Sequence, residues 1–329
     1  MYAAASVLIC VSQVTAQGYN HGEADFTPAE TSRYSVEKKS PSFFHRPKKS
    51  TAAEQLAFAR EKEKKGELRS AKSAYNDLTY EWHNSPEAVT AQYRIARILL
   101  DQGKHVKSFK AFQYLIDHYA GDFDYDEVLD YQIKIASYIM GDRWGDVLFL
   151  PGFEAPERAL PLFEKIIDNA PNMGKAPGVR LKMGLTYEEI KQYENAIASY
   201  DAVQQYHPFS DEAETALFRK SHCLYILAKK APRDEKRCRA ALSALASFLS
   251  RYKMSPNKAE AEGYLEELNL QLSELYYAHA LFYEKKNRPQ SALIAYRDFL
   301  KKFPASDRSD EVYARVKQLE SRNKIQKKE

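Results

Sequence analysis

A short motif recurs along the chain: a small residue, an aromatic residue four positions later, and an apolar residue three positions after that. Its clear copies are Ala71-Tyr75-Leu78, Ser108-Phe112-Leu115, Ala159-Phe163-Ile166, Ala196-Tyr200-Val203 and Ala292-Tyr296-Phe299, and a weaker copy is Ala241-Leu245-Phe248. Offsets of four and three place all three members on one face of a helix. The motif therefore predicts a series of amphipathic helices that each bury the same face.

A second small residue precedes four copies by twelve positions, at Ala59, Ala96, Gly184 and Ala280. A small side chain there lets two antiparallel helices approach closely, and Gly66 and Gly103 mark the turn between them. In three copies a proline follows five residues after the last member, at Pro171, Pro208 and Pro304. Proline cannot continue a helix interior, so it ends the second helix. Each unit is a helix–turn–helix of about 34 residues.

One such hairpin cannot bury its apolar face alone, whereas stacked neighbours can. The period is that of tetratricopeptide repeats. We therefore expect residues 51–322 to form an all-α, right-handed solenoid of about six helical hairpins without β-structure. With only 12 glycines the chain is poorly suited to a turn-rich β fold, and a net charge of +4 is too balanced for an obligate nucleic-acid binder.

The first 16 residues contain no charged side chain, and their apolar stretch is too short to span a bilayer, which takes about 20 residues. We predict a secretory signal peptide cleaved after Ala16. One alternative is lipidation at Cys10, although Ile9 is larger than the residue that usually precedes a lipidated cysteine. A soluble start with an incidental apolar run is a third alternative.

Two polar segments flank the repeats. Residues 17–50 hold several prolines and basic runs but no apolar period, so they cannot bury enough surface to offset their ordering entropy. We predict a disordered tether there, in which Tyr34 and Phe43-Phe44 are candidates for a short docking motif. Residues 323–329 are predicted to be a basic C-terminal tail.

The C-terminal part of the chain resembles one tetratricopeptide family in particular. Residues 266–320 combine a long helix, a Tyr-rich stretch ending in Phe282-Tyr283, a basic turn and the sequence Phe303-Pro304-Ala305-Ser306. Together with the joint at residues 206–213, this stretch resembles BamD (YfiO-like) outer-membrane assembly lipoproteins. The resemblance implies a helical scaffold on the periplasmic face of the outer membrane. It also implies protein partners, namely a β-barrel insertase and its substrates.

The alternative to a BamD-like role is a periplasmic adaptor of the cell envelope, similar to YbgF/CpoB proteins. A coiled-coil segment before the repeats would favour the adaptor, and none is visible in the sequence. A lytic transglycosylase on a helical toroid would need a separate catalytic domain, for which no residues are left. In either scaffold role, contact with the membrane would come only through partners or an N-terminal lipid.

Sequence motifs for catalysis are absent. The chain has no phosphate-binding loop, nucleophile elbow, zincin motif or paired-cysteine motif, and its eight histidines are scattered. The acidic run from Asp122 to Glu127 alternates like the start of a calcium loop. Its sixth position, however, is Glu127 instead of glycine, and its twelfth is Ile133 instead of glutamate. We expect no enzymatic activity, no cofactor and no metal site.

Cys223 and Cys238 lie on either side of the turn expected near Ala231. In an antiparallel hairpin they would sit at the same height, and an exported protein would permit a disulfide between them. A bridge closing about fifteen residues would add about 3 kcal/mol. Two independent buried thiols are the alternative.

An insertion interrupts the third repeat over residues 141–153. It is rich in large apolar side chains, among them Trp144, Phe149 and Phe153. Exposed, these would form a partner-binding loop, because aromatic anchors dominate binding hot spots. Alternatively, the segment would fold back and bury these side chains against the solenoid. This alternative is favoured because large exposed apolar patches are uncommon.

Solenoids bind partners on an extended concave surface. By their spacing from the small residues, Arg60, Lys64, Tyr93 and Arg97 should point toward that surface. Aromatic and arginine side chains are typical of peptide-binding sites, and a peptide carboxylate would suit Arg60 and Arg97. The alternative is a set of solvated helix faces with local ion pairs.

Overall fold

The computed structural model describes residues 46–141, 143–144 and 153–326. These residues form helices, one short strand pair and one 3-10 turn. The elements are α1 (Ala52–Lys64), α2 (Leu68–Glu81), α3 (Pro86–Asp101), α4 (His105–His118), α5 (Tyr125–Gly141), β1 (Arg143–Trp144), β2 (Phe153–Glu154), η1 (Pro156–Ala159), α6 (Leu160–Asn169), α7 (Ala176–Glu189), α8 (Tyr193–Tyr206), α9 (Glu212–Lys230), α10 (Glu235–Arg251), α11 (Lys258–Lys285), α12 (Pro289–Lys302) and α13 (Ser309–Gln326).

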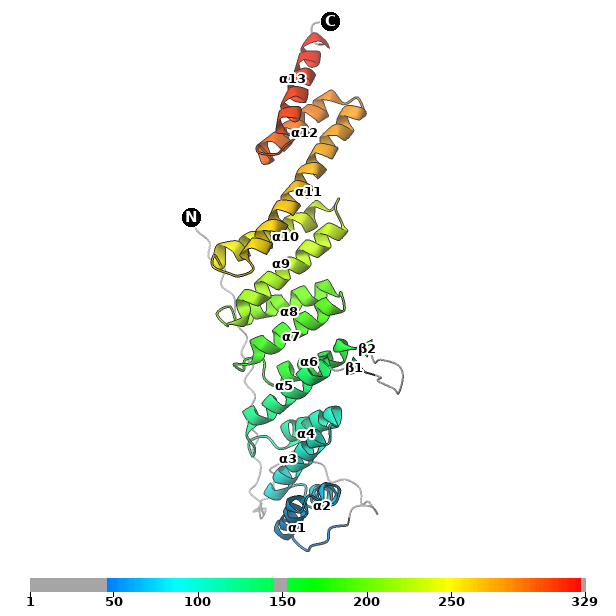
Figure 1. Cartoon of the computed structure of the whole chain (residues 1–329), viewed down its shortest axis with the longest axis vertical. Coiled ribbons are helices and arrows are strands. Elements are labelled where there is room, and N and C mark those ends of the chain that lie inside the picture. The colour runs from blue at the N-terminus through cyan, green and yellow to red at the C-terminus, as the bar shows by residue number, and fades with distance from the viewer. Residues whose placement is uncertain (1–45, 142, 145–152, 327–329) are drawn as a thin grey trace, which may run out of the picture.

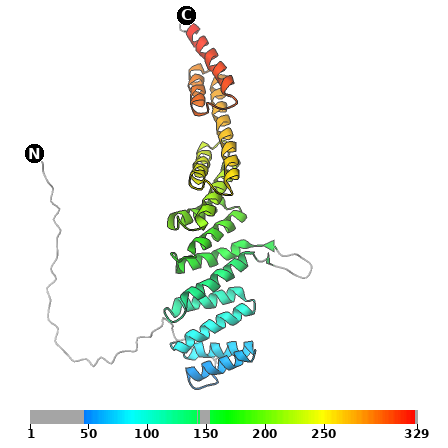
Figure 2. The same ribbon diagram turned by 60° about the vertical axis from the view of Figure 1, so that its left-hand side comes forward.

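Consecutive helices form six antiparallel hairpins in the described part of the chain, from α1/α2 to α11/α12, and α13 follows the last one. Figures 1 and 2 show the hairpins stacked side by side along the long axis, with α1 at one end and α13 at the other. The expected all-α solenoid of tetratricopeptide type is confirmed. Helix α13 continues to Gln326, so the predicted C-terminal tail begins inside a helix.

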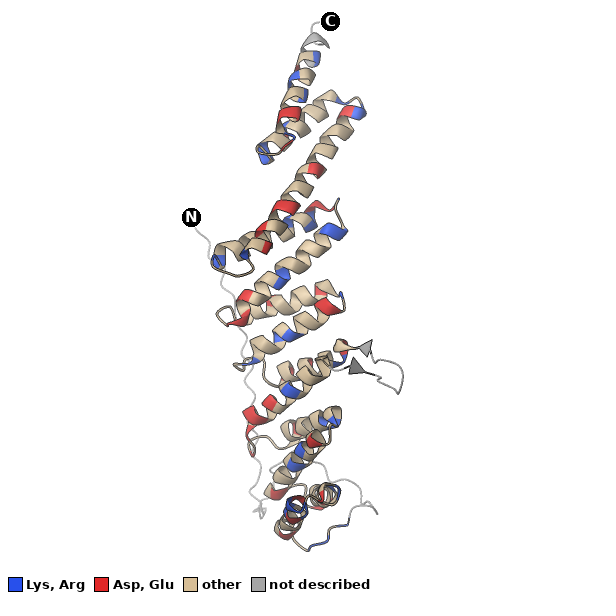
Figure 3. Cartoon of the chain, viewed as in Figure 1, with Lys and Arg blue, Asp and Glu red and all other residues tan. Residues whose placement is uncertain are grey.

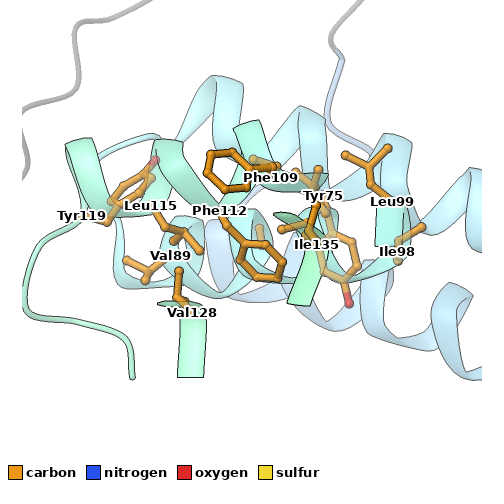
Figure 4. Close-up of a cluster of buried hydrophobic side chains, with 14 of the residues drawn as sticks. Tyr75, Val89, Ile98, Leu99, Phe109, Phe112, Leu115, Tyr119, Val128 and Ile135 are labelled. Carbon is orange, nitrogen blue, oxygen red and sulfur yellow. The ribbon is translucent and has the colours of Figure 1, made fainter. Parts of the chain in front are cut away.

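The repeated motif forms the core of every hairpin. Each residue of its six copies has an exposed fraction of 0 %. Figure 4 shows how the first hairpins share this core: Tyr75 and Phe112 lie among Ile98, Leu115 and Ile135. Small residues opposite the aromatic rings make the packing possible. At Gly184 an added Cβ would lie 2.3 Å from the Tyr200 ring.

The turn inside four of the hairpins has one residue in the left-handed region, seven positions after the small residue of the first helix. These residues are Gly66 (φ 76°), Gly103 (φ 68°), Lys191 (φ 62°) and Asn287 (φ 53°). Glycine adopts this conformation without a steric cost, and asparagine tolerates it better than most residues. The predicted turn positions at Gly66 and Gly103 are confirmed.

The third hairpin contains the insertion, between the end of α5 and η1. Its two ends pair as antiparallel strands, with Arg143 opposite Glu154 and Trp144 opposite Phe153. The expectation of a solenoid without β-structure is therefore wrong at this point. The insertion leaves the third hairpin after α5 and returns to it at η1. Its two ends, β1 and β2, are therefore close enough to pair.

Helix α11 is 28 residues long and serves two neighbours in turn. Its N-terminal half contributes Ala261, Leu268 and Leu272 to a cluster shared with α10. Its C-terminal half contributes Tyr277 and Ala280 to a cluster shared with α12 and α13. The last hairpin is therefore displaced along α11 relative to α10 (Figure 1). Among the described helices, none has the length and apolar character needed to span a bilayer.

Candidate protein-binding site

Tyr93 and Arg97 on α3 form one compact cluster with residues of α5. The Tyr93 hydroxyl donates to Glu127 Oε1 at 2.8 Å, and Arg97 Nη1 donates to the Tyr93 hydroxyl at 3.0 Å. The Arg97 guanidinium also lies 4.5 Å from the centre of the Tyr131 ring and 4.0 Å from Glu127. The predicted pair is thus brought together, with two partners that the sequence analysis did not name.

The cluster keeps a usable positive charge. About 30 % of the Arg97 side chain is exposed. Burial acts to lower the pKa of Arg97, but the hydrogen bond with Tyr93 and the nearby Tyr93, Tyr131 and Asp101 groups together outweigh burial, so the pKa is raised. Burial and the hydrogen bond to Glu127 raise the pKa of Tyr93 to about 12, so its hydroxyl stays protonated. A cation beside two aromatic rings suits the carboxylate and planar amide groups of a peptide.

Arg60 and Lys64 on α1 are exposed. In the described residues, no hydrogen bond or ion pair joins them to Tyr93 or Arg97. The neighbouring Arg94 is instead paired with Glu63 of α1, where its Nε donates to Glu63 Oε2 at 3.0 Å. The structure therefore brings Tyr93 and Arg97 together and leaves Arg60 and Lys64 exposed on the adjacent hairpin.

A repeated Glu–Tyr–Arg triad, which was not predicted from the sequence, joins each of three hairpins to the helix that follows it. In each triad a Glu on the first helix of a hairpin accepts from the core Tyr twelve residues later and from an Arg 31 residues after the Glu, on the helix that follows the hairpin. The three triads are Glu63–Tyr75–Arg94, Glu188–Tyr200–Arg219 and Glu284–Tyr296–Arg315. The Tyr-to-Glu distances are 2.7, 2.9 and 2.6 Å.

The sequence does contain a signal for the triads. Each of the three motif copies with a tyrosine has Glu twelve residues before it. The three copies without a tyrosine have Leu100, Pro151 and Arg233 at that position. A buried phenol hydroxyl needs a hydrogen-bond partner, whereas phenylalanine and leucine do not. The coupling of Tyr with Glu could therefore have been predicted from hydrogen-bonding chemistry.

In the middle triad burial and charge act in opposite directions on the pKa of Glu188 and in the same direction on the pKa of Tyr200. Burial acts to raise the pKa of Glu188, but hydrogen bonds from His222 and Tyr200 and the charge of Arg219 outweigh it, so the pKa is lowered. Burial and the adjacent Glu188 charge raise the pKa of Tyr200 well above its ordinary value. The triads are thus partly buried networks of hydrogen bonds and ion pairs that link each hairpin to the helix that follows it.

Cys223 and Cys238 are free thiols, so the predicted disulfide is not formed. Both are buried, but in different clusters. Cys223 on α9 packs with Tyr200 of α8, whereas Cys238 on α10 donates from Sγ to the Leu268 carbonyl of α11 at 3.5 Å. The two helices direct these residues toward opposite neighbours. The disulfide was predicted from the equal distance of the two cysteines from the turn, and that distance does not specify the direction in which each side chain points. Burial raises the pKa of the Cys223 thiol to about 12.

Other predicted residues lie partly or wholly outside the described part of the chain. Cys10 and Phe149 are not described. For Trp144 and Phe153 the backbone is described, as facing residues of β1 and β2.

The described surface carries both signs of charge. Figure 3 shows Lys and Arg interleaved with Asp and Glu along all the hairpins. Among the residues the structure describes, no group of three or more His, Cys, Asp and Glu side chains is placed to hold a metal ion. The arrangement is that of an extended helical scaffold with local clusters of aromatic and charged side chains.

Helical hairpins of this period and packing define a tetratricopeptide repeat protein. A tetratricopeptide repeat model matches residues 56–123, which span α1 to the end of α4. The family model YfiO, described as outer membrane lipoprotein, matches residues 154–328. Since that match covers more than half of the chain, the protein belongs to the YfiO family. The BamD-like resemblance seen in the sequence is confirmed.

Solved structures of other repeat proteins are similar to the chain at low identity. YrrB, described as a TPR protein with an unusual peptide-binding site, is 14 % identical over 65 % of this chain and 92 % of its own, with a TM-score of 0.33. A tetratricopeptide repeat protein from Parabacteroides merdae is 14 % identical over 82 % of this chain and 98 % of its own, with a TM-score of 0.31. PilW, described as a type IV pilus biogenesis factor, is 14 % identical over 80 % of this chain and 99 % of its own, with a TM-score of 0.29. No curated protein sequence matches.

Proposed function

We propose that this protein is a non-catalytic, protein-binding scaffold that acts in the assembly of outer-membrane β-barrel proteins, as a BamD-like component. The observation that carries the proposal is the match of the outer-membrane lipoprotein family YfiO to residues 154–328. That region contains the last three hairpins, from α7 to α12, and α13. The protein then works at the periplasmic face of the outer membrane, with an insertase and its substrates as partners.

Two features of the fold support a scaffold. The hairpins present an extended surface, and side chains along it combine aromatic rings with cations, as Arg97 does with Tyr93 and Tyr131. Arginine and tyrosine are enriched at the energetic centres of protein interfaces. Lipidation at Cys10 or cleavage after Ala16 would each deliver the chain to the periplasmic side, the former with a membrane anchor.

Controlled depletion in the native host tests this function. Loss of the protein should reduce the steady-state amount of several outer-membrane β-barrel proteins several-fold, and an episomal copy should restore them. The level of an outer-membrane lipoprotein without a barrel provides the control and should stay constant. Unchanged barrel proteins after depletion, or an equal loss of the control protein, would contradict the proposal.

A further inference from the structure

The displacement of the last hairpin leaves one face of α11 uncovered. The N-terminal half of α11 packs on α10, but α12 pairs only with the C-terminal half. The turn between α12 and α13 overhangs the uncovered part (Figure 1). Between them lies a groove of about 630 Å³.

Both walls of this groove, which we call the α11 groove, have an apolar centre. Glu266, Asn269, Leu270 and Ser273 of α11 form one wall, and residues 302–307 form the other. Leu270 is 59 % exposed, although it lies in the middle of a long helix. Phe303 is held in place edge-on against Tyr276, with ring centres 5.5 Å apart. The α11 wall is about 10 Å long, at 1.5 Å per residue.

The charge of the α11 groove is negative. Lys302 is neutralised locally, because its Nζ donates to Asp298 Oδ2 and to the Tyr276 hydroxyl, both at 2.9 Å. Glu266 and Asp307 line the groove and make no ion pair with any residue that the structure describes. An occupant would therefore gain by bringing cations to these two carboxylates.

We propose that the α11 groove is a docking site for a basic, amphipathic helix of a partner protein. We infer a helix as the occupant because the first helix of each other hairpin is covered by the second helix of the same hairpin. The N-terminal half of α11 lacks such a covering helix. Apolar side chains of the docked helix would meet Leu270 and Phe303, and its lysines or arginines would face Glu266 and Asp307. An anionic lipid surface would be repelled by the same carboxylates. The inference rests on the proposed function in taking the partner to be a protein.

Peptide binding to the full mature chain tests the inference. The probe is a fluorescent 14-residue lysine–leucine peptide with leucines at helical spacing, and a glutamate–leucine peptide with the same leucines is its counterpart. The lysine peptide should bind at least tenfold tighter than the glutamate peptide. Leu270→Asp should weaken binding tenfold or more. Its matched control is Ile294→Asp, since Ile294 is 69 % exposed on α12 outside the groove, and this variant should bind as the wild type does.

Charge reversal gives the sharper readout. Glu266→Lys combined with Asp307→Lys should invert the preference, so that the glutamate peptide binds tighter, whereas Glu81→Lys at an exposed site on α2 should not. Equal binding of both peptides by the wild type, or equal losses in Leu270→Asp and Ile294→Asp, would overturn the proposal. A tenfold gain in peptide affinity on deleting residues 17–45 would also overturn the proposal, because that N-terminal segment of the chain would then be the occupant of the groove.

The experiments distinguish a failure of the groove proposal from a failure of the proposed assembly function. The peptide assay does not depend on barrel assembly, and the depletion assay does not depend on the α11 groove. Absent peptide binding with an intact depletion effect would remove only the groove, and the reverse pattern would remove only the assembly function.

Discussion

A tyrosine at the core position of a helical hairpin brings a hydroxyl that must find a partner in the interior. In this chain Glu63, Glu188 and Glu284 supply it, and an arginine of the helix that follows each hairpin balances the carboxylate. Such a group is costly when one member is removed, because the others remain buried without their partner. The hairpins are therefore joined by polar contacts as well as by apolar packing.

Removing the carboxylate of the middle triad should expose this dependence. We expect Glu188→Leu to lower the free energy of unfolding by about 1–3 kcal/mol, because the Tyr200 hydroxyl loses its acceptor. Adding Tyr200→Phe should recover part of the loss, since Leu100 and Phe112 occupy the same two positions in the second hairpin. Urea unfolding of the wild type, both single variants and the double variant measures the coupling. Strictly additive losses would contradict the triad.

The triads also predict how stability depends on pH. The pKa of Glu63 and of Glu188 is lowered on folding, so their contribution is complete above the ordinary value of 4.5 and is lost as the pH falls below it. The pKa of Tyr200 is raised, so its contribution is complete below the ordinary value of 10.0 and is lost as the pH rises above it. Unfolding free energies from pH 3 to 11 should therefore show a plateau with two declining limbs. Both limbs should be shallower in the Glu188→Leu/Tyr200→Phe variant, and unchanged limbs would refute the assignment.

At the scale of single helices, replacing glycine with alanine should change the stability in opposite directions at two positions. An added Cβ at Gly184 of α7 would lie 2.3 Å from the Tyr200 ring, while one at Gly263 of α11 would meet nothing within 4 Å. We expect Gly184→Ala to destabilise by about 1–3 kcal/mol through overpacking. Gly263→Ala should instead stabilise by about 0.5–1 kcal/mol, because alanine loses less backbone entropy in a helix. Thermal unfolding of the two variants checks both signs, and a shift in the same direction for both would contradict the packing described.

Most helices could be predicted from the chain because the motif encodes a helical face directly. The spacing from Ala71 to Leu78, repeated to Phe299, identifies the buried residues, and these are completely buried in the structure. The breaks also follow local chemistry, with glycine at turns and proline after second helices.

Features that depend on neighbouring elements could not be predicted in the same way. The direction of Cys238 toward Leu268 is set by the packing of α11 on α10, and it separates Cys238 from Cys223. The uncovered face at Leu270 follows from where α12 joins α11, which the length of α11 by itself does not specify. Of the predicted binding residues, Tyr93 and Arg97 meet because they are one helical turn apart, whereas Arg60 and Lys64 lie on another hairpin.

At the scale of the whole molecule, we propose two separate binding regions on the solenoid, one near its first hairpins and one near its last. For the first, we predict that Arg60→Glu combined with Arg97→Glu weakens binding of a peptide that ends in a free carboxylate by tenfold or more. The amide of the same peptide should bind weakly to both proteins, because it lacks the charge that these arginines recognise. Fluorescence anisotropy measures the affinities, and equal affinity of the variant and the wild type for the carboxylate peptide would remove this site.

Purification of the tagged protein from cell envelopes, with quantitative identification of its partners, tests the central claim most directly. Our account predicts that a β-barrel insertase co-purifies in near-equal amount with the full chain. Recovery of the protein without an insertase, from envelopes in which the insertase is abundant and intact, would contradict the account.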